Sequence, residues 1–451
     1  MTTPYADELS RIVPRESLPP AHVHGEYAVD GLTPMTVVVP ENRDQVVEVM
    51  RWASENEVTV FPRGGGTKII LGNPPDAVGV VLDLSRLNRV IDYQPGDMTA
   101  TVEAGITLAA LQAELATARQ FVPLESPLLE RATVGGTLST ALAGPMAHAY
   151  GPPRDWLLGV GVVGAEGVAT KAGGRVVKNV TGYDLNRLYT GSLGTLGIML
   201  EATFKVSPVQ PEDYALVAPF DSMNDAVQGG WEALNLAAGP ASYLALTRGL
   251  ARLFLASHPQ FVVSQAMGEI MGGMGLGFFQ GRSAAVRRRM EDTSAALLNA
   301  GALDAVTAGN DGPGAARQWV LDLGWEEDAR PSLSIRMSAP RRIVPALVDT
   351  CLRVGLLETP SEILADPGFG SVRVLFWGDA DSQGILETID EVRGAARQHG
   401  ASAIIEICHP SIKATLDVWG QEPGSMGLMR SIKDQLDPQR LLNRGRFLGR
   451  I

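Results

Sequence analysis

The segment that most constrains the fold is residues 61–68, Phe-Pro-Arg-Gly-Gly-Gly-Thr-Lys, where three consecutive glycines follow an apolar run. The run at residues 58–61 predicts a short buried strand, so the glycines lie at a strand end. Because this turn has no Cβ atoms, several backbone N–H groups can approach an anion together. Arg63 and Lys68 flank the glycines and add positive charge. The loop therefore suits a pyrophosphate, and the alternative is a tight turn between two strands.

The residues around this loop predict a strand–helix–strand unit. Residues 35–39 alternate as a strand does, and residues 41–55 carry apolar side chains at helical spacing. Residues 78–82 predict another strand. The glycine loop then follows the carboxyl end of a strand, where ligands collect in such layouts.

Three further motifs follow in the same half of the chain. At residues 132–140, Ala-Thr-Val-Gly-Gly-Thr-Leu-Ser-Thr, paired glycines open a helix of small residues. Its N-terminus allows backbone to approach a phosphate or a flat ring, and the alternative is close packing of the helix on a strand. Residues 178–185 contain Lys-Asn-Val-Thr-Gly-Tyr-Asp-Leu, and residues 191–198 have glycines at spacing three.

From about residue 209 the pattern changes. Strand and helix signals alternate up to residue 407, for example a strand at 333–337 followed by a helix at 341–354. This order is typical of an α+β domain with a mostly antiparallel sheet covered on one face.

Composition excludes several classes of protein. The 451 residues predict roughly two to three domains. The formal charge of -12 argues against binding to nucleic acid, which depends on excess Lys and Arg. Cys351 and Cys408 are too few for a cluster or zinc site of cysteines, and we expect free thiols in a reducing compartment. The histidine spacings predict no metal site.

The chain also has no apolar run of membrane-span length and no signal-peptide pattern at its N-terminus. We therefore expect a cytoplasmic protein, or one peripheral to the inner membrane through partners.

As a set, the motifs at 62–67, 133–136, 178–185 and 191–198 resemble the flavin-binding half of the vanillyl-alcohol oxidase/p-cresol methylhydroxylase (PCMH) superfamily. The tail, Leu-Asn-Arg-Gly-Arg at 442–446, is similar to a late motif of that family. The branch it resembles most is the smaller of the two FAD-binding chains of bacterial glycolate oxidase, which works beside a larger FAD subunit and an iron–sulfur subunit.

The resemblance implies an α+β chain with a PCMH-type FAD-binding domain and a cap. The implied divisions are an N-terminal extension (1–29), the FAD-binding domain (30–208), the cap or substrate domain (209–420) and a C-terminal segment that returns to the FAD domain (421–451).

The resemblance also implies the cofactor contacts. The first loop would surround the pyrophosphate, the second segment would line the isoalloxazine and phosphate side, and residues 197–198 would reach the adenine or ribose. The implied FAD-binding residues are Arg63, Gly64, Gly65, Gly66, Thr67, Lys68, Thr133, Gly135, Gly136, Ser139, Thr140, Gly197, Ile198, Asn443 and Arg446.

The chain departs from the family at three points. Members with covalent flavin often carry a histidine near the first loop, whereas this chain has Gly66 in the triple glycine, which implies non-covalent FAD. The usual Gly-Ser-Glu-Gly motif has Leu193 in place of its carboxylate. The late His-Gly-x-Gly motif and the metal-binding histidines of the stand-alone 2-hydroxy-acid dehydrogenases are absent from the sequence.

Oxidation of a 2-hydroxy acid needs a cation for the carboxylate and a base for the hydroxyl proton. Arg336 is a candidate for the cation and His409 for the base; each is also explained as a solvated side chain at a sheet surface. Arg373 and His148 are weaker candidates of the same kinds. Residues 267–279, rich in Met, Phe and Gly, indicate either a partner-facing surface or internal packing.

These observations predict the FAD-binding subunit of a glycolate-oxidase-like 2-hydroxy-acid dehydrogenase complex, which passes electrons to its partners. One alternative is a self-sufficient FAD-dependent oxidoreductase of unknown substrate. The other is a non-catalytic scaffold that retains the fold.

Overall fold

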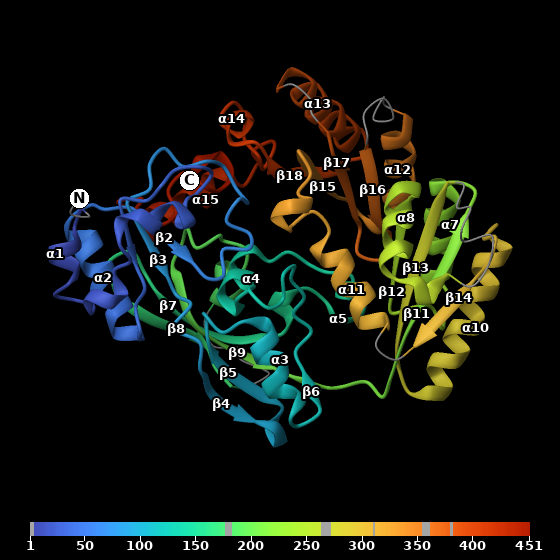
Figure 1. Ribbon diagram of the computed structural model, residues 1–451, viewed down its shortest axis with the longest axis horizontal. Helices are drawn as coiled ribbons and strands as arrows, with labels where there is room; N and C mark the ends of the chain where they lie inside the picture. The colour runs from blue at the N-terminus through green and yellow to red at the C-terminus, as the bar shows by residue number, and fades with distance from the viewer. Residues whose placement is uncertain (1–3, 176–182, 263–271, 310–311, 354–360, 379–381) are drawn as a thin grey trace. The chain divides into compact units, whose positions relative to one another are not determined.

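The computed structural model describes residues 4–175, 183–262, 272–309, 312–353, 361–378 and 382–451 (Figure 1). The chain forms two compact units. The first unit contains residues 1–143, 152–209 and 413–451, and the second contains residues 144–151 and 210–412.

A small parallel sheet organises the start of the first unit. Its strands lie in the order β1 (Thr36–Val38), β3 (Val80–Asp83), β2 (Val60–Arg63), and both pairings are parallel. Helix α2 (Arg43–Glu55) connects β1 to β2 and begins where the side chain of Asn42 accepts the backbone N–H of Gln45. The predicted strand–helix–strand unit is confirmed, and the glycine loop begins directly after β2.

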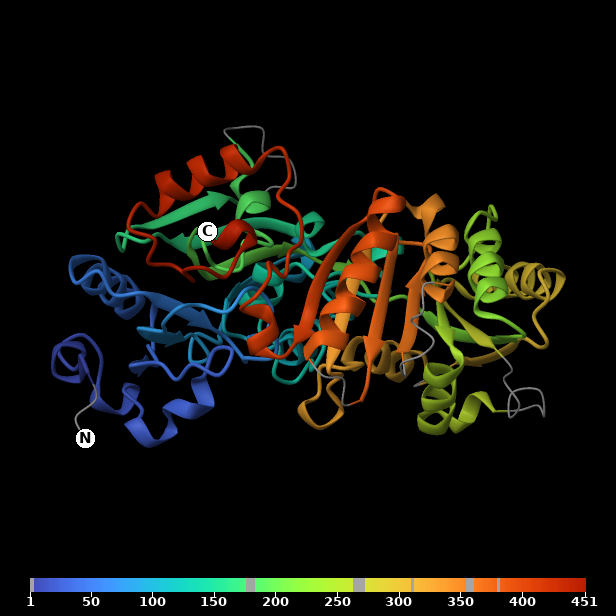
Figure 2. The same ribbon diagram turned by 90° about the horizontal axis from the view of Figure 1, so that it is seen from above.

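The tail of the chain joins this sheet. The backbone N–H of Val60 donates to the carbonyl of Leu441 at 2.8 Å, and that of Asn443 donates to the carbonyl of Val60 at 3.0 Å. Residues 441–443 therefore run parallel to β2. Helix α15 (Met426–Leu436) precedes them, in red in Figure 2.

An antiparallel sheet of five strands forms the rest of the first unit, in the order β4-β5-β9-β7-β8. Val102, Val160, Ala202 and other buried residues of this sheet pack against the helices. The strands and helices are β4 (Val90–Gln94), β5 (Thr99–Glu103), β7 (Leu157–Val163), β8 (Ala169–Gly173), β9 (Ile198–Lys205), α3 (Leu108–Ala116), α4 (Val134–Thr140) and α6 (Leu185–Tyr189).

The second unit is built on an eight-stranded antiparallel sheet, in the order β14-β11-β13-β12-β16-β17-β15-β18. The fold class predicted for this part is confirmed. The strands are β11 (Glu212–Phe220), β12 (Ser242–Thr247), β13 (Gly273–Gly281), β14 (Val306–Gly309), β15 (Leu333–Ser338), β16 (Ser361–Asp366), β17 (Ser371–Phe376) and β18 (Ser402–Cys408).

Helices cover both faces of this sheet, whereas the sequence pattern predicted cover on one face. On one face lie α7 (Met223–Leu234), α10 (Ser283–Asn299), α12 (Val344–Arg353) and α13 (Ser382–Gln398). On the other lie α8 (Arg248–Ser257) and α11 (Gly312–Asp322), which pack against Leu244, Leu276 and Leu375 in an apolar cluster. The prediction was wrong because α8 and α11 were not identified from the sequence.

Two segments that the sequence singled out lie only partly within the described residues. Residues 176–182, which include five of the eight residues of the Lys-Asn-Val-Thr-Gly-Tyr-Asp-Leu motif, lie outside the described residues, as do residues 263–271. Met274, Phe278 and Phe279 of the same Met- and Phe-rich segment are fully buried in β13, so these three residues serve internal packing. Within the described ranges, no helix combines the length and the apolar character needed to cross a bilayer.

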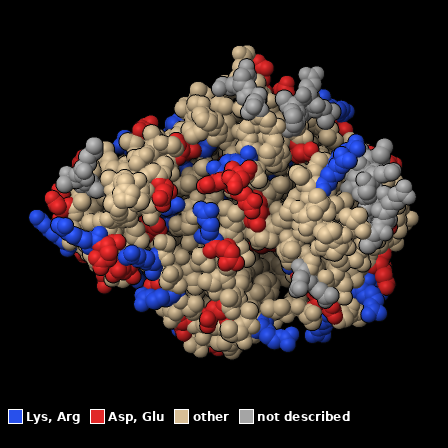
Figure 3. Space-filling view, in the orientation of Figure 1, with Lys and Arg blue, Asp and Glu red and all other residues tan. Residues whose placement is uncertain are grey.

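Charged side chains of both signs are interspersed on the face drawn in Figure 3.

Candidate functional site

The first unit contains a cavity that begins at the glycine loop after β2. All fifteen residues for which the sequence predicted cofactor contacts line this cavity: Arg63, Gly64, Gly65, Gly66, Thr67, Lys68, Thr133, Gly135, Gly136, Ser139, Thr140, Gly197, Ile198, Asn443 and Arg446. Their individual contacts with a ligand stay predictions.

The glycine loop packs against the segment that leads into α4. A Cβ on Gly64 would lie 2.0 Å from Oγ1 of Thr133, and one on Gly65 would lie 1.7 Å from the carbonyl oxygen of Arg131. Gly66 has φ +69°, and the guanidinium of Arg63 lies where its Cβ would be. Gly64 and Gly65 therefore bring two distant segments together, and Gly66 allows the left-handed turn, in addition to any role toward a ligand.

The same loop carries a row of unused backbone donors. In the described part of the chain, no hydrogen bond uses the backbone N–H of Gly64, Gly65, Gly66, Thr67 or Lys68 as donor. Successive N–H groups of this kind form a concave anion site. The loop is therefore the part of the cavity that is best suited to a phosphate.

The start of α4 offers no such donors, contrary to the interpretation of its paired glycines as a phosphate approach. The N–H of Val134 donates to the carbonyl of Ile106, that of Gly135 to the carbonyl of Ala104 at 2.7 Å, and that of Gly136 to Oγ1 of Thr133. The alternative from the sequence, close packing of helix on strand, describes this end of the helix. The side chains of α4 still line the cavity.

The motif at residues 191–198 closes another side of the cavity. The backbone N–H of Leu193 donates to the carbonyl of Ser139 on α4, and Leu193 has φ +53°. The side-chain amide of Asn443 donates to the carbonyl of Leu193, so the tail holds this turn. Leu193 also lines the cavity, which adds an apolar side chain where the family motif has a carboxylate.

Arg63 and Lys68, the two cations of the loop, have different surroundings. The guanidinium of Arg63 stacks over the ring of Tyr27 at 4.4 Å and lies 3.9 Å from the carboxylate of Asp83. Lys68 is 8% exposed, and its Nζ donates to Oγ of Ser126 at 2.7 Å. Burial lowers the pKa of Lys68 to about 7.

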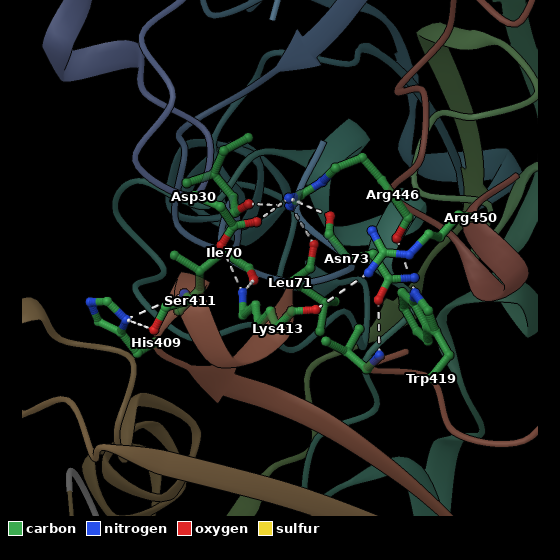
Figure 4. Close-up of polar contacts among 12 residues, drawn as sticks. Asp30, Ile70, Leu71, Asn73, His409, Ser411, Lys413, Trp419, Arg446 and Arg450 are labelled. Atoms are coloured by element: carbon green, nitrogen blue, oxygen red, sulfur yellow. Dashed lines mark hydrogen bonds and ion pairs between the residues drawn. The ribbon is translucent and has the colours of Figure 1, made fainter. Parts of the chain in front are cut away.

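Arg446 is held by groups of the first unit, as Figure 4 shows. Its guanidinium contacts the carboxylate of Asp30 and donates to the carbonyls of Ile69, Leu71 and Asn73. Asp30 also pairs with the buried Lys413 at 2.8 Å. These contacts hold residues 69–73, which continue the glycine loop, against the tail. The guanidinium of Arg446 therefore stabilises the conformation of the loop.

Arg336, the predicted carboxylate clamp, is paired inside the second unit. Its Nε lies 2.5 Å from Oε1 of the buried Glu406, and Nε of Arg373 lies 2.8 Å from Oε2. Burial would raise the pKa of Glu406, but the charges of Arg336 and Arg373 and hydrogen bonds from Arg336 and Ser334 lower it overall. The carboxylate of Glu406 therefore forms ion pairs with both guanidinium groups.

A bulge in β18 places Glu406 between the arginines. Ser334 pairs with Ile407 and Ile335 with Ile405, so Glu406 is the extra residue. Bulges re-aim a side chain in this way. Arg373 is fully buried, and its Nη2 has no hydrogen-bond partner among the described residues. The sequence left Arg373 as a weaker candidate and missed Glu406, because no pattern signals a bulge.

The histidines do not join this cluster. His409 is exposed and contacts the side chain of Ser411 at 2.7 Å. It follows Cys408, which pairs with Leu333, three residues along β15 from Arg336, or roughly 10 Å at the usual strand rise. Nδ1 of His148 contacts the carbonyl of Gly368, and burial and then Arg341 lower the pKa of His148. Arg336 and His409 therefore do not form an adjacent cation–base pair.

Other residues that line the cavity were not predicted. They are mainly apolar, and no motif marks them: Pro62, Ile69, Leu71, Leu84, Ala104, Leu193, Gly194 and Met199. In the described residues, no group of three or more His, Cys, Asp or Glu could hold a metal ion.

Comparisons with known proteins agree on the first unit. Residues 34–173 match the family described as "FAD binding domain". The chain is 33% identical over 195 residues to glycolate oxidase subunit GlcD of Bacillus subtilis, covering 43% of this chain and 42% of that protein. It is 35% identical over 164 residues to subunit GlcE of Escherichia coli, covering 36% of this chain and 46% of that protein.

Another relative matches over most of its length. D-2-hydroxyglutarate dehydrogenase of Xanthomonas citri is 27% identical over 445 residues, covering 92% of this chain and 89% of that protein. By contrast, the GlcD and GlcE matches each span less than half of the relative's length.

The fold is that of the p-cresol methylhydroxylase type. The structure of p-cresol methylhydroxylase with substrate bound has a TM-score of 0.75 at 16% identity, covering 98% of this chain and 95% of that chain.

The residues of the cavity fit FAD. The five unused N–H groups of the glycine loop suit a pyrophosphate, and the cavity is lined by small side chains that leave room for flat rings. FAD, which the matched domain family binds, is therefore the cofactor.

Proposed function

We propose that this chain, a member of the FAD-linked 2-hydroxy-acid oxidoreductase family, is the FAD-binding subunit of a glycolate-oxidase-like complex that passes electrons to partner subunits. The observation that carries the proposal is the cavity of the first unit, where three separated segments, 133–140, 193–199 and 443–446, meet the glycine loop. The partners would be a second FAD subunit and an iron–sulfur subunit.

When bound, FAD supplies the acceptor for the electron pair of the substrate. The chain contributes binding and orientation. The unused N–H groups of residues 64–68 hold the pyrophosphate, and Leu193 and Met199 exclude water from the cavity wall. We expect non-covalent attachment, because the glycine run offers no nucleophilic side chain at Gly64, Gly65 or Gly66.

The second unit supports a dependent role. The carboxylate of Glu406 already occupies Arg336, the side chain best placed by sequence to bind a substrate carboxylate. His409 lies away from Arg336 along the sheet. Among the described residues, the guanidinium of Arg336 is neutralised by Glu406 and His409 does not lie beside it, an arrangement better suited to carrying electrons than to oxidising the substrate alone.

A second candidate function is a self-sufficient dehydrogenase. The match to D-2-hydroxyglutarate dehydrogenase over 92% of the chain favours it. So does Nη2 of Arg373, a buried donor for which the described residues provide no acceptor and to which a substrate carboxylate could bind. In that case Arg373, rather than Arg336, is the clamp.

The test is the visible absorption spectrum of the chain purified alone, before and after anaerobic addition of glycolate or D-lactate. The proposal predicts a flavin spectrum that dithionite bleaches and that neither 2-hydroxy acid bleaches until the partner subunits are added. Bleaching by the acid in the isolated chain, lost in Arg373→Met, would favour the second candidate. Absence of flavin after addition of FAD would leave a scaffold.

A further inference from the structure

Lys68 is a buried amine on the wall of the cofactor cavity. It ends the glycine loop, and its Nζ is held by Oγ of Ser126 at 2.7 Å. Ser126 is itself 1% exposed and lies in the segment between β6 (Gln120–Phe121) and α4. An ammonium has three donors, and the described residues provide this one acceptor.

The other cations of the cavity are balanced by carboxylates of the chain. Arg63 lies beside Asp83, and Arg446 is paired with Asp30. For Lys68, the described residues provide no carboxylate within ion-pair distance. A buried charge without a partner is costly, and an amine avoids the cost by losing its proton.

We propose that the ammonium of Lys68 is the counter-charge for the pyrophosphate of bound FAD, so that binding of FAD transfers one proton from solvent to the Lys68 amine. The proposal rests on the proposed role in FAD binding and adds a proton to that step. We assign the contact of Lys68 to the pyrophosphate, rather than to another part of FAD, because the unused N–H groups of residues 64–68 belong to the same loop as Lys68.

The pKa of Lys68, which burial lowers to about 7, puts this transfer in the neutral range. Without an anion the amine loses its proton above this pH. With a pyrophosphate beside it, the charged form is favoured and the pKa rises. Between the two pKa values, binding takes up a proton, and the affinity for FAD therefore falls as the pH rises.

Other charged groups on the elements around Lys68 are Arg63 and Asp83 at the ends of β2 and β3, Arg446 and Asp30 of the tail contact, and Glu125 beside Ser126. Carboxylates and guanidinium groups ordinarily titrate far from neutrality. A proton taken up between pH 7 and 9 is therefore assigned to Lys68 by its loss in a Lys68 variant.

The test is isothermal titration calorimetry of the FAD-free chain with FAD, in pairs of buffers with different ionisation enthalpies, from pH 6 to 9. We expect uptake of up to one proton above pH 7, and an affinity that falls by up to about tenfold per pH unit. FAD binding without proton uptake would overturn the Lys68 proposal and leave the proposed function intact. Failure of FAD to bind would overturn the proposed function itself.

Two variants test whether Lys68 is the group that takes up the proton. Lys68→Met should bind FAD without uptake and with an affinity independent of pH in this range. Lys171→Met is the matched control, since Lys171 is exposed and paired with Glu201 at 2.7 Å, and it should behave as the unmodified chain. Proton uptake retained in Lys68→Met would overturn the assignment.

Two ligands separate the parts of FAD. ADP-ribose has the pyrophosphate without the flavin ring, and riboflavin has the ring without phosphate. Uptake with ADP-ribose and none with riboflavin is expected. The opposite result would move the contact of Lys68 to the ring and overturn the pyrophosphate assignment.

A measurement on the FAD-free chain gives an independent check that Lys68 is buried and neutral. In the unfolded chain a lysine keeps its proton up to about pH 10.4, so between pH 7 and that value the unfolded state binds more protons than the folded state. The melting temperature of the FAD-free chain should therefore rise with pH relative to Lys68→Met in this window. A constant difference would contradict a neutral, buried Lys68.

Discussion

Each of the three glycines at residues 64–66 has its own physical reason to lack a side chain. Gly64 faces the hydroxyl of Thr133, Gly65 faces a backbone carbonyl, and Gly66 has positive φ. A flexible side chain could move aside for a Cβ, whereas the carbonyl of Arg131 belongs to a segment tied to α3 by hydrogen bonds. The sequence predicted the loop from its glycines, but the partners of Gly64 and Gly65 belong to residues 131–133, a separate segment of the chain.

Gly65→Ala should therefore damage both stability and cofactor binding. The Cβ would lie 1.7 Å from the carbonyl oxygen of Arg131 and force the loop away from residues 131–133. We expect a loss of about 1–3 kcal/mol in the free energy of unfolding. Affinity for FAD should fall by more than about tenfold, the effect of losing a hydrogen bond to a charged group.

Urea unfolding and FAD titration measure these two effects. Gly96→Ala is the control, because a Cβ at Gly96 meets nothing within 4 Å. Equal behaviour of the two variants would show that close approach at Gly65 is not required.

At the scale of elements, segments with clear apolar spacing were predicted well, whereas two neighbouring strands near the middle of the eight-stranded sheet were not predicted. The strands β2, β11 and β15 and the helices α2 and α7 were identified from apolar spacing. Strands β12 and β16 were missed; β12 is buried on both faces, which removes the alternation that marks a strand. The bulge at Glu406 could not be predicted either, since it depends on the register between β15 and β18.

Glu406→Gln tests the cluster that this bulge creates. Two guanidinium groups would lose their shared carboxylate, and we expect a loss of about 3–5 kcal/mol in the free energy of unfolding at pH 7. Glu391→Gln, an exposed change on α13, should have no such effect.

The pH dependence of the free energy of unfolding tests whether Glu406 is charged in the folded state. The pKa of Glu406 is lowered in the folded state, so its contribution is complete above the unfolded value of about 4.3 and is lost as the pH falls through the folded value. The difference between the unmodified chain and Glu406→Gln should thus shrink below about pH 4. A difference that grows in acid would contradict a charged Glu406.

The tail provides a second test at this scale. Arg446→Ala would leave Asp30 buried with Lys413 alone and release the carbonyls of residues 69–73. Removing one partner of a buried pair costs about 3–5 kcal/mol. Arg444→Ala, at an exposed residue of the same segment, is the control in thermal unfolding. Equal melting temperatures would show that the tail does not fix the loop.

For the whole molecule, the sequence predicted which residues meet but not how each is used. All fifteen proposed cofactor contacts line one cavity, because motifs that serve one ligand converge even when they are far apart along the chain. The roles of α4 and Arg446 were not predictable, since N–H groups and a guanidinium can be satisfied by carbonyls that no motif marks. In the second unit, the pairing of Arg336 and Arg373 with Glu406 likewise depends on contacts that no motif marks.

The measurement that tests the central claim most directly is the amount and release of FAD. The chain is purified, its FAD content is measured per chain, and the protein is then precipitated with acid. The account predicts one FAD per chain, all of it released into the supernatant, for the unmodified protein and for Gly96→Ala. A chain that takes up no FAD, or FAD that stays with the precipitated protein, would contradict non-covalent binding in the cavity of the first unit.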